Sequence, residues 1–454
     1  MTDVTRIVVV GGGPGGYEAA MVAARLDAQV TVVDRDGLGG SAVLTDCVPS
    51  KTLIASADAA GAASASGLGV ALSDPRVDLG RVNGRVLELA RQQSADIGAR
   101  LSAAGVRVIS GRGRLDGPSA VVVGDERLAA DAILIATGAH PRVLAEAPPD
   151  GERILTWTQV YGLRELPEHL IVVGSGVTGA EFADAYHRLG ARVTLVSSRD
   201  RVLPGEDADA AAVLEGAFTR RGMTVLSRSR ASAVRRVGDG VEVSLTDGRV
   251  ISGSHCLMAV GSVPNTAGLG LAEAGVALSE GGFIEVDRVS RTSARGVYAA
   301  GDCTGVLMLA SVAAHQGRIA MQHALGDAVR PLDLHTVAAN VFTDPEIATV
   351  GWTQDQVERG DIPARTVTLP LATNPRAKMQ GLRDGFVKLY CRPGTGIVVG
   401  GVVVAPRASE LIFPISLAVD AQLSVDVIAH AFTVYPSMTG SVAEAARLLH
   451  LPPD

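Results

Sequence analysis

The chain has 454 residues, with 41 basic and 48 acidic side chains and a formal net charge of −7. A length of this order predicts about three domains. The sequence contains no basic block that would indicate a nucleic-acid partner, and no apolar run reaches the roughly 20 residues that a membrane-spanning helix needs.

Cysteine usage and the first residues indicate the cellular compartment. The four cysteines, Cys47, Cys256, Cys303 and Cys391, are widely scattered and show no metal-ligand spacing, which is typical of a reducing compartment. The opening "MTDVTRIVVVGGGPGG" has no basic segment and no cleavage site, so it predicts a strand and not a signal peptide. We therefore expect a cytoplasmic protein without a bound metal.

The first motif along the chain is a glycine-rich turn. The segment "RIVVVGGGPGGYEAA" predicts a buried strand, a turn with Gly11, Gly13 and Gly16, and then a helix. Glycines in this order permit the tight turn, the approach of a pyrophosphate and close packing of helix on strand, and the helix N-terminus attracts the phosphates. Asp34 ends the next strand, where its carboxylate can accept the hydroxyls of a ribose. This part of the chain predicts a dinucleotide site.

The next segment, "GGSAVLTDCVPSKTL" at 39–53, looks like one half of a redox-active disulfide loop. Cys47 is followed by a Pro-Ser turn and Lys51. The position five residues before Cys47 is Ala42, so the loop lacks the second sulfur. An internal disulfide is therefore excluded at this place.

A second glycine-rich turn follows in "HLIVVGSGVTGAEFADAYHRLGARVTLVSSRD", with Gly174, Gly176 and Gly179. Its second strand ends at Ser197, where the first motif has an acid, and Ser198 and Arg199 follow. An acid would repel a 2′-phosphate, whereas serine and arginine can donate hydrogen bonds to it. We expect this site to accept NADPH, alone or alongside NADH; the alternative is that the arginines only face solvent. Two such sites in one chain indicate a flavin and a nicotinamide that exchange electrons.

Together with these motifs, further segments make the chain resemble the flavoprotein disulfide reductase family, lipoamide dehydrogenase in particular. In "GSVPNT", Ser262 replaces the family's arginine, and the Asp302 of "GVYAAGDC" matches the aspartate that holds the ribityl chain of FAD. The segments that carry the resemblance are "ILIATGAHPR", "GSVPNT", "GVYAAGDC", "LASVAAHQG", "VFTDPEIATVG" and "VVVAPRASELI".

The resemblance implies an α/β fold with two Rossmann-like dinucleotide-binding domains and a C-terminal α+β dimerisation domain. It places an FAD-binding domain at 1–150, an NAD(P)-binding domain at 151–268, a second part of the FAD-binding domain at 269–334, and the dimerisation domain at 335–454. A homodimer is implied as well.

The resemblance also assigns cofactor-binding residues, which lie in the motifs quoted above or close to them. For FAD they are Gly11, Gly13, Gly16, Asp34, Gly40, Lys51, Gly113, Thr137, Gly138, Asp302, Ala310 and Ala313. For NAD(P) they are Gly174, Gly176, Gly179, Ser197, Ser198, Arg199, Ala231 and Gly261.

Three positions depart from the family in one respect: they remove the dithiol chemistry. Ala42 stands at the attacking cysteine. In "VYPSMTGSV", Tyr435 stands at the histidine and Gly440 at the glutamate of the proton-shuttling pair. A phenol is a poor proton shuttle at neutral pH because its ordinary pKa is near 10. Disulfide reduction at this site is therefore not expected.

The flavin's own surroundings are retained. The resemblance places Lys51 beside the flavin N5 and pairs it with Glu181, so that a fixed cation favours the anionic reduced flavin; the alternative is an ordinary surface lysine. Cys47 is interpreted as an inherited packing residue, with a charge-transfer contact to the flavin as the alternative. Tyr435 is a further candidate, as a hydrogen-bond donor to an acceptor oxygen.

An acceptor that needs no thiol fits this set of residues. Replacing cysteine, histidine and glutamate removes polar groups from the disulfide-side pocket and makes room for an apolar ring. We therefore expect an FAD-dependent NAD(P)H:quinone oxidoreductase, as in the branch of the family that lacks the redox disulfide. Two alternatives stay open: a soluble NAD(P) transhydrogenase, and a weakly active flavin-binding redox sensor.

Overall fold

The computed structural model describes residues 4–64 and 76–450. Its contacts divide the chain into two compact units. The first unit combines 1–52, 81–142 and 261–333, and the second combines 53–80, 143–260 and 334–454. Both units contain sheets covered by helices, so the expected α/β fold is confirmed; the four-segment division of the chain stays a prediction.

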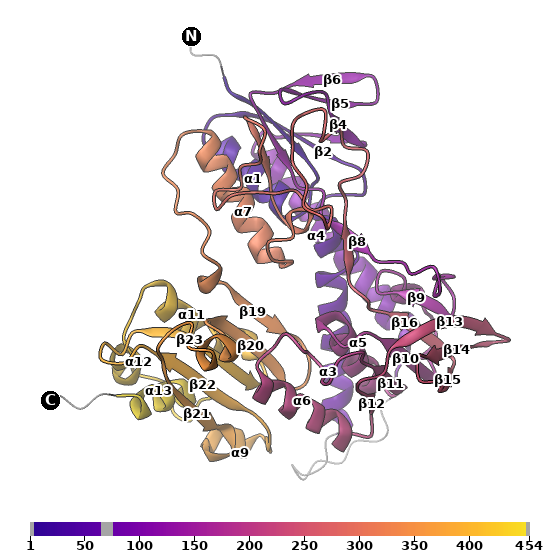
Figure 1. The fold of residues 1–454 in the computed structure, drawn as a ribbon, viewed down its shortest axis with the longest axis vertical. Coiled ribbons are helices and arrows are strands. Elements are labelled where there is room, and N and C mark those ends of the chain that lie inside the picture. Colours follow the sequence, from indigo (N-terminus) through magenta and orange to yellow (C-terminus); the bar gives the residue numbers. More distant parts are fainter. Residues whose placement is uncertain (1–3, 65–75, 451–454) are drawn as a thin grey trace. The chain divides into compact units, whose positions relative to one another are not determined.

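The core of the first unit is a parallel five-stranded sheet in the order β18-β7-β1-β2-β3. Its central strands are runs of valine, isoleucine and leucine, as expected for strands covered on both faces. Helices α1 and α7 pack side by side (Figure 1), and a Cβ atom on Gly317 of α7 would lie 2.0 Å from the Gly15 carbonyl oxygen of α1. The elements are β1 (Arg6–Val10), α1 (Pro14–Arg25), β2 (Gln29–Asp34), α4 (Leu79–Ala103), β3 (Arg107–Ser110), β7 (Ala132–Ile135), β18 (Val297–Ala299) and α7 (Ala310–Ala324).

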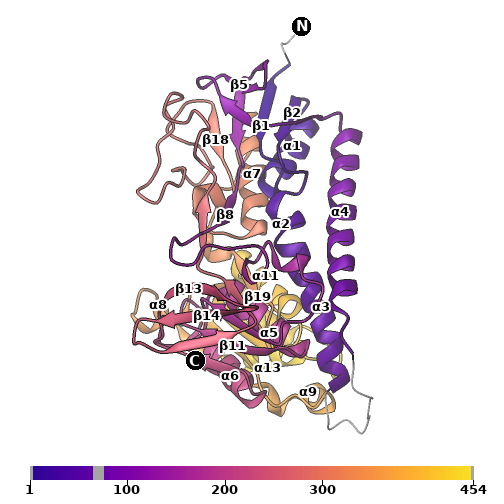
Figure 2. The ribbon, with the colours of Figure 1, turned by 90° about the vertical axis from the view of Figure 1, so that its right-hand side faces the viewer.

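Smaller elements of the first unit surround this sheet. Figure 2 shows α1 against β1 and β2, with the short α2 following. Two antiparallel sheets join the elements β4-β5-β6 and β17-β8. Their bounds, with those of α2 and of α3, which begins in this unit and continues in the second, are α2 (Gly40–Leu44), α3 (Cys47–Ser64), β4 (Gly113–Leu115), β5 (Ala120–Val123), β6 (Glu126–Ala129), β8 (Ala139–Pro141) and β17 (Ser262–Pro264).

The second unit contains a parallel sheet of the same kind, in the order β12-β11-β10-β16-β9. A three-stranded antiparallel sheet, β13-β14-β15, accompanies it. The two parallel sheets thus repeat one Rossmann-like arrangement. The elements are β9 (Ile154–Thr156), β10 (His169–Val173), α5 (Val177–Arg188), β11 (Arg192–Val196), α6 (Ala208–Arg220), β12 (Thr224–Leu226), β13 (Ala231–Val237), β14 (Gly240–Leu245), β15 (Val250–Gly253) and β16 (His255–Met258).

The C-terminal part of the second unit has an antiparallel sheet in the order β19-β20-β23-β22-β21. Strand β23 is buried along its whole length, and α11 and α13 pack against the sheet. The expected α+β organisation of this part is confirmed. The elements are β19 (Ala338–Val341), β20 (Glu346–Gly351), α8 (Gln354–Glu358), β21 (Arg365–Pro370), α9 (Pro375–Met379), β22 (Phe386–Cys391), β23 (Val398–Ala405), α10 (Ala408–Leu411), α11 (Phe413–Asp420), α12 (Val425–His430) and α13 (Thr439–Leu448).

Across residues 4–64 and 76–450, no helix combines the length and the apolar character needed to cross a bilayer.

Candidate functional site

The first cradle, Gly11–Gly16, has the geometry that its glycines predict. Gly11 has a φ of +107°, and a Cβ atom there would lie 2.2 Å from the carbonyl oxygen of Ala136. A Cβ atom at Gly16 would lie 1.8 Å from the Gly11 carbonyl oxygen, so α1 can pack closely on β1 only with glycine. A Cβ atom on Gly13, the N-cap of α1, would meet only the Gly40 Cα atom, at 3.9 Å. A pyrophosphate can therefore approach the backbone at the helix N-terminus.

Asp34, the last residue of β2, fixes the loop beside the first cradle. Its Oδ2 accepts the Gly12 N–H at 2.6 Å, and its Oδ1 accepts the N–H groups of Asp36 at 2.9 Å and Gly37 at 2.5 Å. These bonds hold the carboxylate at the C-terminal edge of the sheet. Dinucleotides bind at this edge in such folds.

A cavity of about 210 Å³ opens beside the first cradle. Four residues predicted to bind FAD line it: Gly11, Asp34, Gly113 and Thr137. Two further lining residues, His140 and Asn265, were missed in the sequence. Their side chains meet at 2.6 Å, and the Asn265 Nδ2 donates to the Thr137 carbonyl oxygen at 2.8 Å. The "GSVPNT" motif contains Asn265, so the signal was present.

The other predicted FAD residues of the first unit lie at the ends of its elements. Gly40 begins α2, and a Cβ atom there would lie 2.9 Å from the Gly13 Cα atom. Gly138 follows Thr137 after β7 with a φ of +67°. Ala310 begins α7, and Ala313 lies in its first turn. Ala313 approaches the first cradle, because a Cβ atom on Gly15 would lie 3.2 Å from the Ala313 carbonyl oxygen.

Asp302 starts the short helix Asp302–Thr304 that follows β18. Burial, with a contribution from the neighbouring charge of Asp46, raises the pKa of the Asp302 carboxyl to about 6. A buried carboxyl of this kind is stabilised by donors such as the hydroxyls of a ribityl chain. Its surroundings therefore fit the predicted role.

The second cradle, Gly174–Gly179, repeats the geometry of the first. Gly174 has a φ of +112°, and a Cβ atom there would lie 2.1 Å from the Ala259 carbonyl oxygen. A Cβ atom at Gly179 would lie 1.8 Å from the Gly174 carbonyl oxygen, and nothing lies within 4 Å of a Cβ atom at Gly176. Gly176 is the N-cap of α5. The second cradle can therefore hold a second pyrophosphate in the same way.

The two cradles differ at the strand end. In the first, Asp34 accepts the Gly12 N–H. In the second, the Ser197 hydroxyl is fully buried and bonds the Ser175 hydroxyl at 2.7 Å, over the same separation of 22 residues. The Ser175 partner was missed in the sequence, although it occupies the place of Gly12 in the repeat. This exchange removes the negative charge from the second site.

The loop from Gly39 to Lys51 places its three key residues on two helices. Ala42 lies in α2, Cys47 begins α3, and Lys51 lies in the second turn of α3. All three side chains are half-buried. Lys51 belongs to the first unit and Glu181 to the second, so their pairing stays a prediction.

Glu181 and Asp184, both buried on α5, hold the segment between β19 and β20. The Glu181 Oε1 accepts the Phe342 N–H at 2.9 Å, and the Asp184 Oδ2 accepts the Asp344 N–H at 2.9 Å. The helix of the second cradle is thus joined through two carboxylates to the C-terminal sheet. The sequence motif indicates Glu181 as a site residue but not Asp184.

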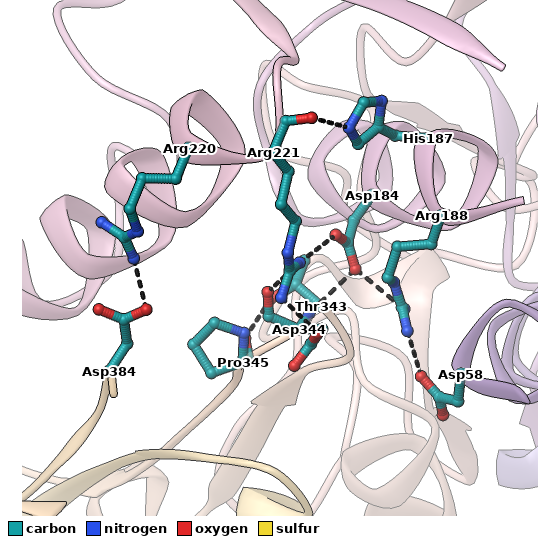
Figure 3. A network of polar contacts seen from close by, with 10 residues as sticks. All are labelled: Asp58, Asp184, His187, Arg188, Arg220, Arg221, Thr343, Asp344, Pro345 and Asp384. Carbon is teal, nitrogen blue, oxygen red and sulfur yellow. Dashed lines mark hydrogen bonds and ion pairs between the residues drawn. The ribbon is translucent and has the colours of Figure 1, made fainter. Parts of the chain in front are cut away.

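Asp184 is the centre of a network of charged side chains (Figure 3). Its carboxylate pairs with Arg188 at 2.9 Å and with Arg221 at 3.3 Å. Arg188 also pairs with Asp58 of α3, and Arg221 with Asp344. Burial raises the pKa of Asp184 to about 6, while the two arginines oppose this rise. Within the second unit, the network ties the part of α3 that contains Asp58 to α5.

The remaining predicted residues are dispersed. Tyr435 is 83 % exposed, and Gly440 lies in the first turn of α13. Ala231 begins β13, and Ser198 and Arg199 are exposed directly after Ser197. Gly261, with a φ of +93°, lies in the first unit.

Known proteins with similar sequences cover nearly all of the chain. The profile described as "Pyridine nucleotide-disulphide oxidoreductase" matches residues 5–317, and the dimerisation-domain profile of the same family matches residues 337–446. The "NAD(P)H dehydrogenase (quinone)" of Mycobacterium tuberculosis strain H37Rv is 56 % identical over 463 residues, covering 98 % of this chain and 94 % of the relative. The dihydrolipoyl dehydrogenase of Zymomonas mobilis is 34 % identical and covers 99 % of this chain and 100 % of the relative.

Solved structures agree with these sequence matches. The crystal structure of LpdA from Mycobacterium tuberculosis has a TM-score of 0.94 at 56 % identity, covering 99 % of this chain and 100 % of that one. The HOCl-induced flavoprotein disulfide reductase RclA from Escherichia coli has a TM-score of 0.87 at 25 % identity, covering 98 % and 100 %. The resemblance seen in the sequence is confirmed. With both cradles, the Cys47 loop and the C-terminal sheet in place, the chain belongs to the pyridine nucleotide-disulphide oxidoreductase family.

Proposed function

We propose that the protein is an FAD-dependent oxidoreductase that transfers two electrons from NAD(P)H to a quinone. The overall reaction converts NAD(P)H, a proton and a quinone into NAD(P)⁺ and a hydroquinone. The observation that carries the proposal is the contrast between two well-formed cradles and a loop with Ala42 in place of a second cysteine. The quinone-linked name of the 56 % identical relative supports it.

The first cradle fits FAD. Gly13 leaves the N-terminus of α1 open to a pyrophosphate, and Asp34 and Asp302 offer carboxylates to ribose and ribityl hydroxyls. Bound FAD supplies a ring that can accept a hydride from NAD(P)H. In the protein, the N-terminus of α1 holds the pyrophosphate, and the start of α3 carries the Lys51 ammonium.

The second cradle fits a nicotinamide dinucleotide, and we propose that NADPH is used, alone or alongside NADH. The uncharged Ser197–Ser175 pair replaces the acid that would repel a 2′-phosphate. Ser198 and Arg199 are exposed directly after it and can donate hydrogen bonds. This support concerns only the adenosine end of the nucleotide.

The proposed acceptor follows from what the chain lacks. Reducing a disulfide needs a thiolate pair and a base, and Ala42, Tyr435 and Gly440 supply neither. A quinone needs no thiol. We propose that Tyr435 donates a hydrogen bond to the acceptor oxygen and that Cys47 is a packing residue.

We propose a homodimer as the working form. In the second unit, the C-terminal part exposes large apolar side chains that are each more than half accessible in the single chain. They are Phe413, Leu417, Val427, Phe432, Val434, Tyr435 and Leu448. Contiguous exposed apolar patches mark interaction surfaces, and the dimerisation-domain profile covers all of these residues except Leu448.

Initial-rate assays on FAD-loaded enzyme test the proposal. NADPH or NADH is supplied as the donor, with menadione or oxidised lipoamide as the acceptor. We expect turnover with menadione and none with lipoamide. Turnover with lipoamide, or none with any benzoquinone or naphthoquinone, would overturn the proposed function.

A further inference from the structure

Two arginines lie together at the edge of the second cradle's sheet, and only one of them follows β11. Strand β12 pairs with β11 up to Leu226 opposite Val196. The alignment continues beyond both strands, because the Arg228 N–H donates to the Arg199 carbonyl oxygen at 2.7 Å and the Ser229 N–H to the Ser197 carbonyl oxygen at 2.7 Å. Arg228 is therefore placed beside Arg199 at the C-terminal edge, where the adenosine ribose of a dinucleotide is bound.

The backbone of Arg228 is strained. Its φ is +51°, in the left-handed region that favours glycine or asparagine. Such strain is unfavourable and tends to occur at functional sites. In the part of the chain that the structure describes, no hydrogen bond or ion pair of the Arg228 guanidinium offsets this strain.

Both guanidinium groups are available to a ligand. Arg199 and Arg228 are exposed. Among the described residues, neither guanidinium has an ion pair or side-chain hydrogen bond. Arg201 differs, because its guanidinium donates to the carbonyl oxygens of Pro204 and Glu206, each at 3.4 Å. Exposed Asp200 is the acid next to Arg199 in the sequence, so the group of Arg199, Asp200, Arg201 and Arg228 keeps a net positive charge.

We propose that Arg228, together with Arg199, binds the 2′-phosphate of NADPH and is a specificity-determining residue of the second cradle. The inference rests on the proposed use of NADPH. A guanidinium offers paired N–H donors that match a phosphate, and two of them on adjacent strand ends can contact different oxygens. NADH lacks this phosphate and gains nothing from either arginine.

Titration calorimetry on FAD-loaded enzyme tests the inference, with NADP⁺ and NAD⁺ as probes that differ only by the 2′-phosphate. The variant is Arg228→Asn, because asparagine tolerates the left-handed backbone. Its Kd for NADP⁺ should rise about ten-fold or more, as expected for a lost charge-assisted hydrogen bond. Its Kd for NAD⁺ should stay unchanged. Arg228→Gly relieves the strain and should give the same result without loss of thermal stability.

The matched control is Arg235→Gln, which removes an exposed charge from β13 of the same unit. It should leave both affinities unchanged. An equal loss for NADP⁺ and NAD⁺ in the Arg228 variants, or no loss for either, would overturn the inference. Because binding is measured without an acceptor, failure of quinone reduction alone would overturn the proposed function and leave this inference standing.

Discussion

Glu181 on α5 accepts a hydrogen bond of 2.9 Å from the backbone N–H of Phe342, which follows β19. The carboxylate is buried. Its bond therefore satisfies a backbone N–H that would otherwise be left without a hydrogen-bond acceptor. The same residue is the predicted partner of Lys51 beside the flavin. One carboxylate thus combines a local structural role, which is observed, with a proposed electrostatic one.

Two variants separate these roles. Glu181→Gln keeps an oxygen for the Phe342 N–H and removes the charge, so stability should change little. Bound flavin should nevertheless show a shifted absorbance spectrum and slower reduction by NADPH in stopped flow. Glu181→Ala also leaves the N–H unsatisfied and should cost about 1–3 kcal/mol in urea unfolding. An unchanged flavin spectrum and reduction rate in Glu181→Gln would refute the charge role.

Arg188 is expected to stabilise the second unit. Its nearly buried guanidinium bridges Asp184 and Asp58, so Arg188→Met should lower the free energy of unfolding by about 3 kcal/mol. The loss should be larger at pH 8 than at pH 5, because removal of Arg188 raises the pKa of Asp184 further and ionisation then costs more. Arg91→Met removes an exposed pair with Glu88 and should cost at most about 0.5 kcal/mol. Equal losses in the two variants would contradict the network's role.

His255, on β16 beside β10, should make stability depend on pH. Its Nε2 lies 3.1 Å from the Arg153 guanidinium, which can only donate. Burial and Arg153 lower the pKa of His255 to about 4. The contribution of neutral His255 to the free energy of unfolding is therefore fully present above the pKa of the unfolded state, near 6.5. It is lost as the pH falls through the folded-state pKa of about 4.

The comparison of wild type with His255→Gln isolates this effect, because other titrating groups are common to both proteins. Between pH 7 and pH 4 the wild type should lose on the order of 2 kcal/mol relative to the variant, after allowance for partial solvent screening. Urea unfolding at a series of pH values measures the difference. A constant difference across this range would show that His255 does not titrate as expected.

Restoring one sulfur should not restore disulfide chemistry. Ala42→Cys supplies the second cysteine of the loop, but Tyr435 and Gly440 still lack the base and the carboxylate of the proton shuttle. The variant should oxidise dihydrolipoamide no faster than wild type. The comparison is the triple variant Ala42→Cys, Tyr435→His and Gly440→Glu, which is expected to oxidise dihydrolipoamide. Activity in Ala42→Cys alone would show that the C-terminal correspondence is misplaced.

The sequence predicted both cradles because their glycines follow a fixed local spacing. The carbonyl oxygens that crowd Gly16 and Gly179 belong to Gly11 and Gly174, five residues earlier in the chain. Those that crowd Gly11 and Gly174 belong to Ala136 and Ala259, which only the folded chain brings near. The resemblance likewise predicted the sheets that follow. Local patterns of this kind repeat in recognisable order, so they can be read without a structure.

The contacts of Asp184 could not be read in this way. Its spacing from Arg188 indicates an i, i+4 pair, but Asp58 lies 130 residues from Arg188 and Asp344 lies 160 residues from Asp184. The Ser175–Ser197 bond depends on how β10 and β11 end side by side. Partners that tertiary packing brings together carry no signal in a single sequence.

The most direct test of the central claim is a double-mixing stopped-flow experiment on FAD-loaded wild type. The enzyme is first reduced with one equivalent of NADPH and then mixed with menadione, oxidised lipoamide or thio-NAD⁺ while the flavin absorbance is followed. We expect rapid reoxidation by menadione, none by lipoamide and slower reoxidation by thio-NAD⁺. Reoxidation that is fastest with lipoamide or with thio-NAD⁺ would contradict the central claim.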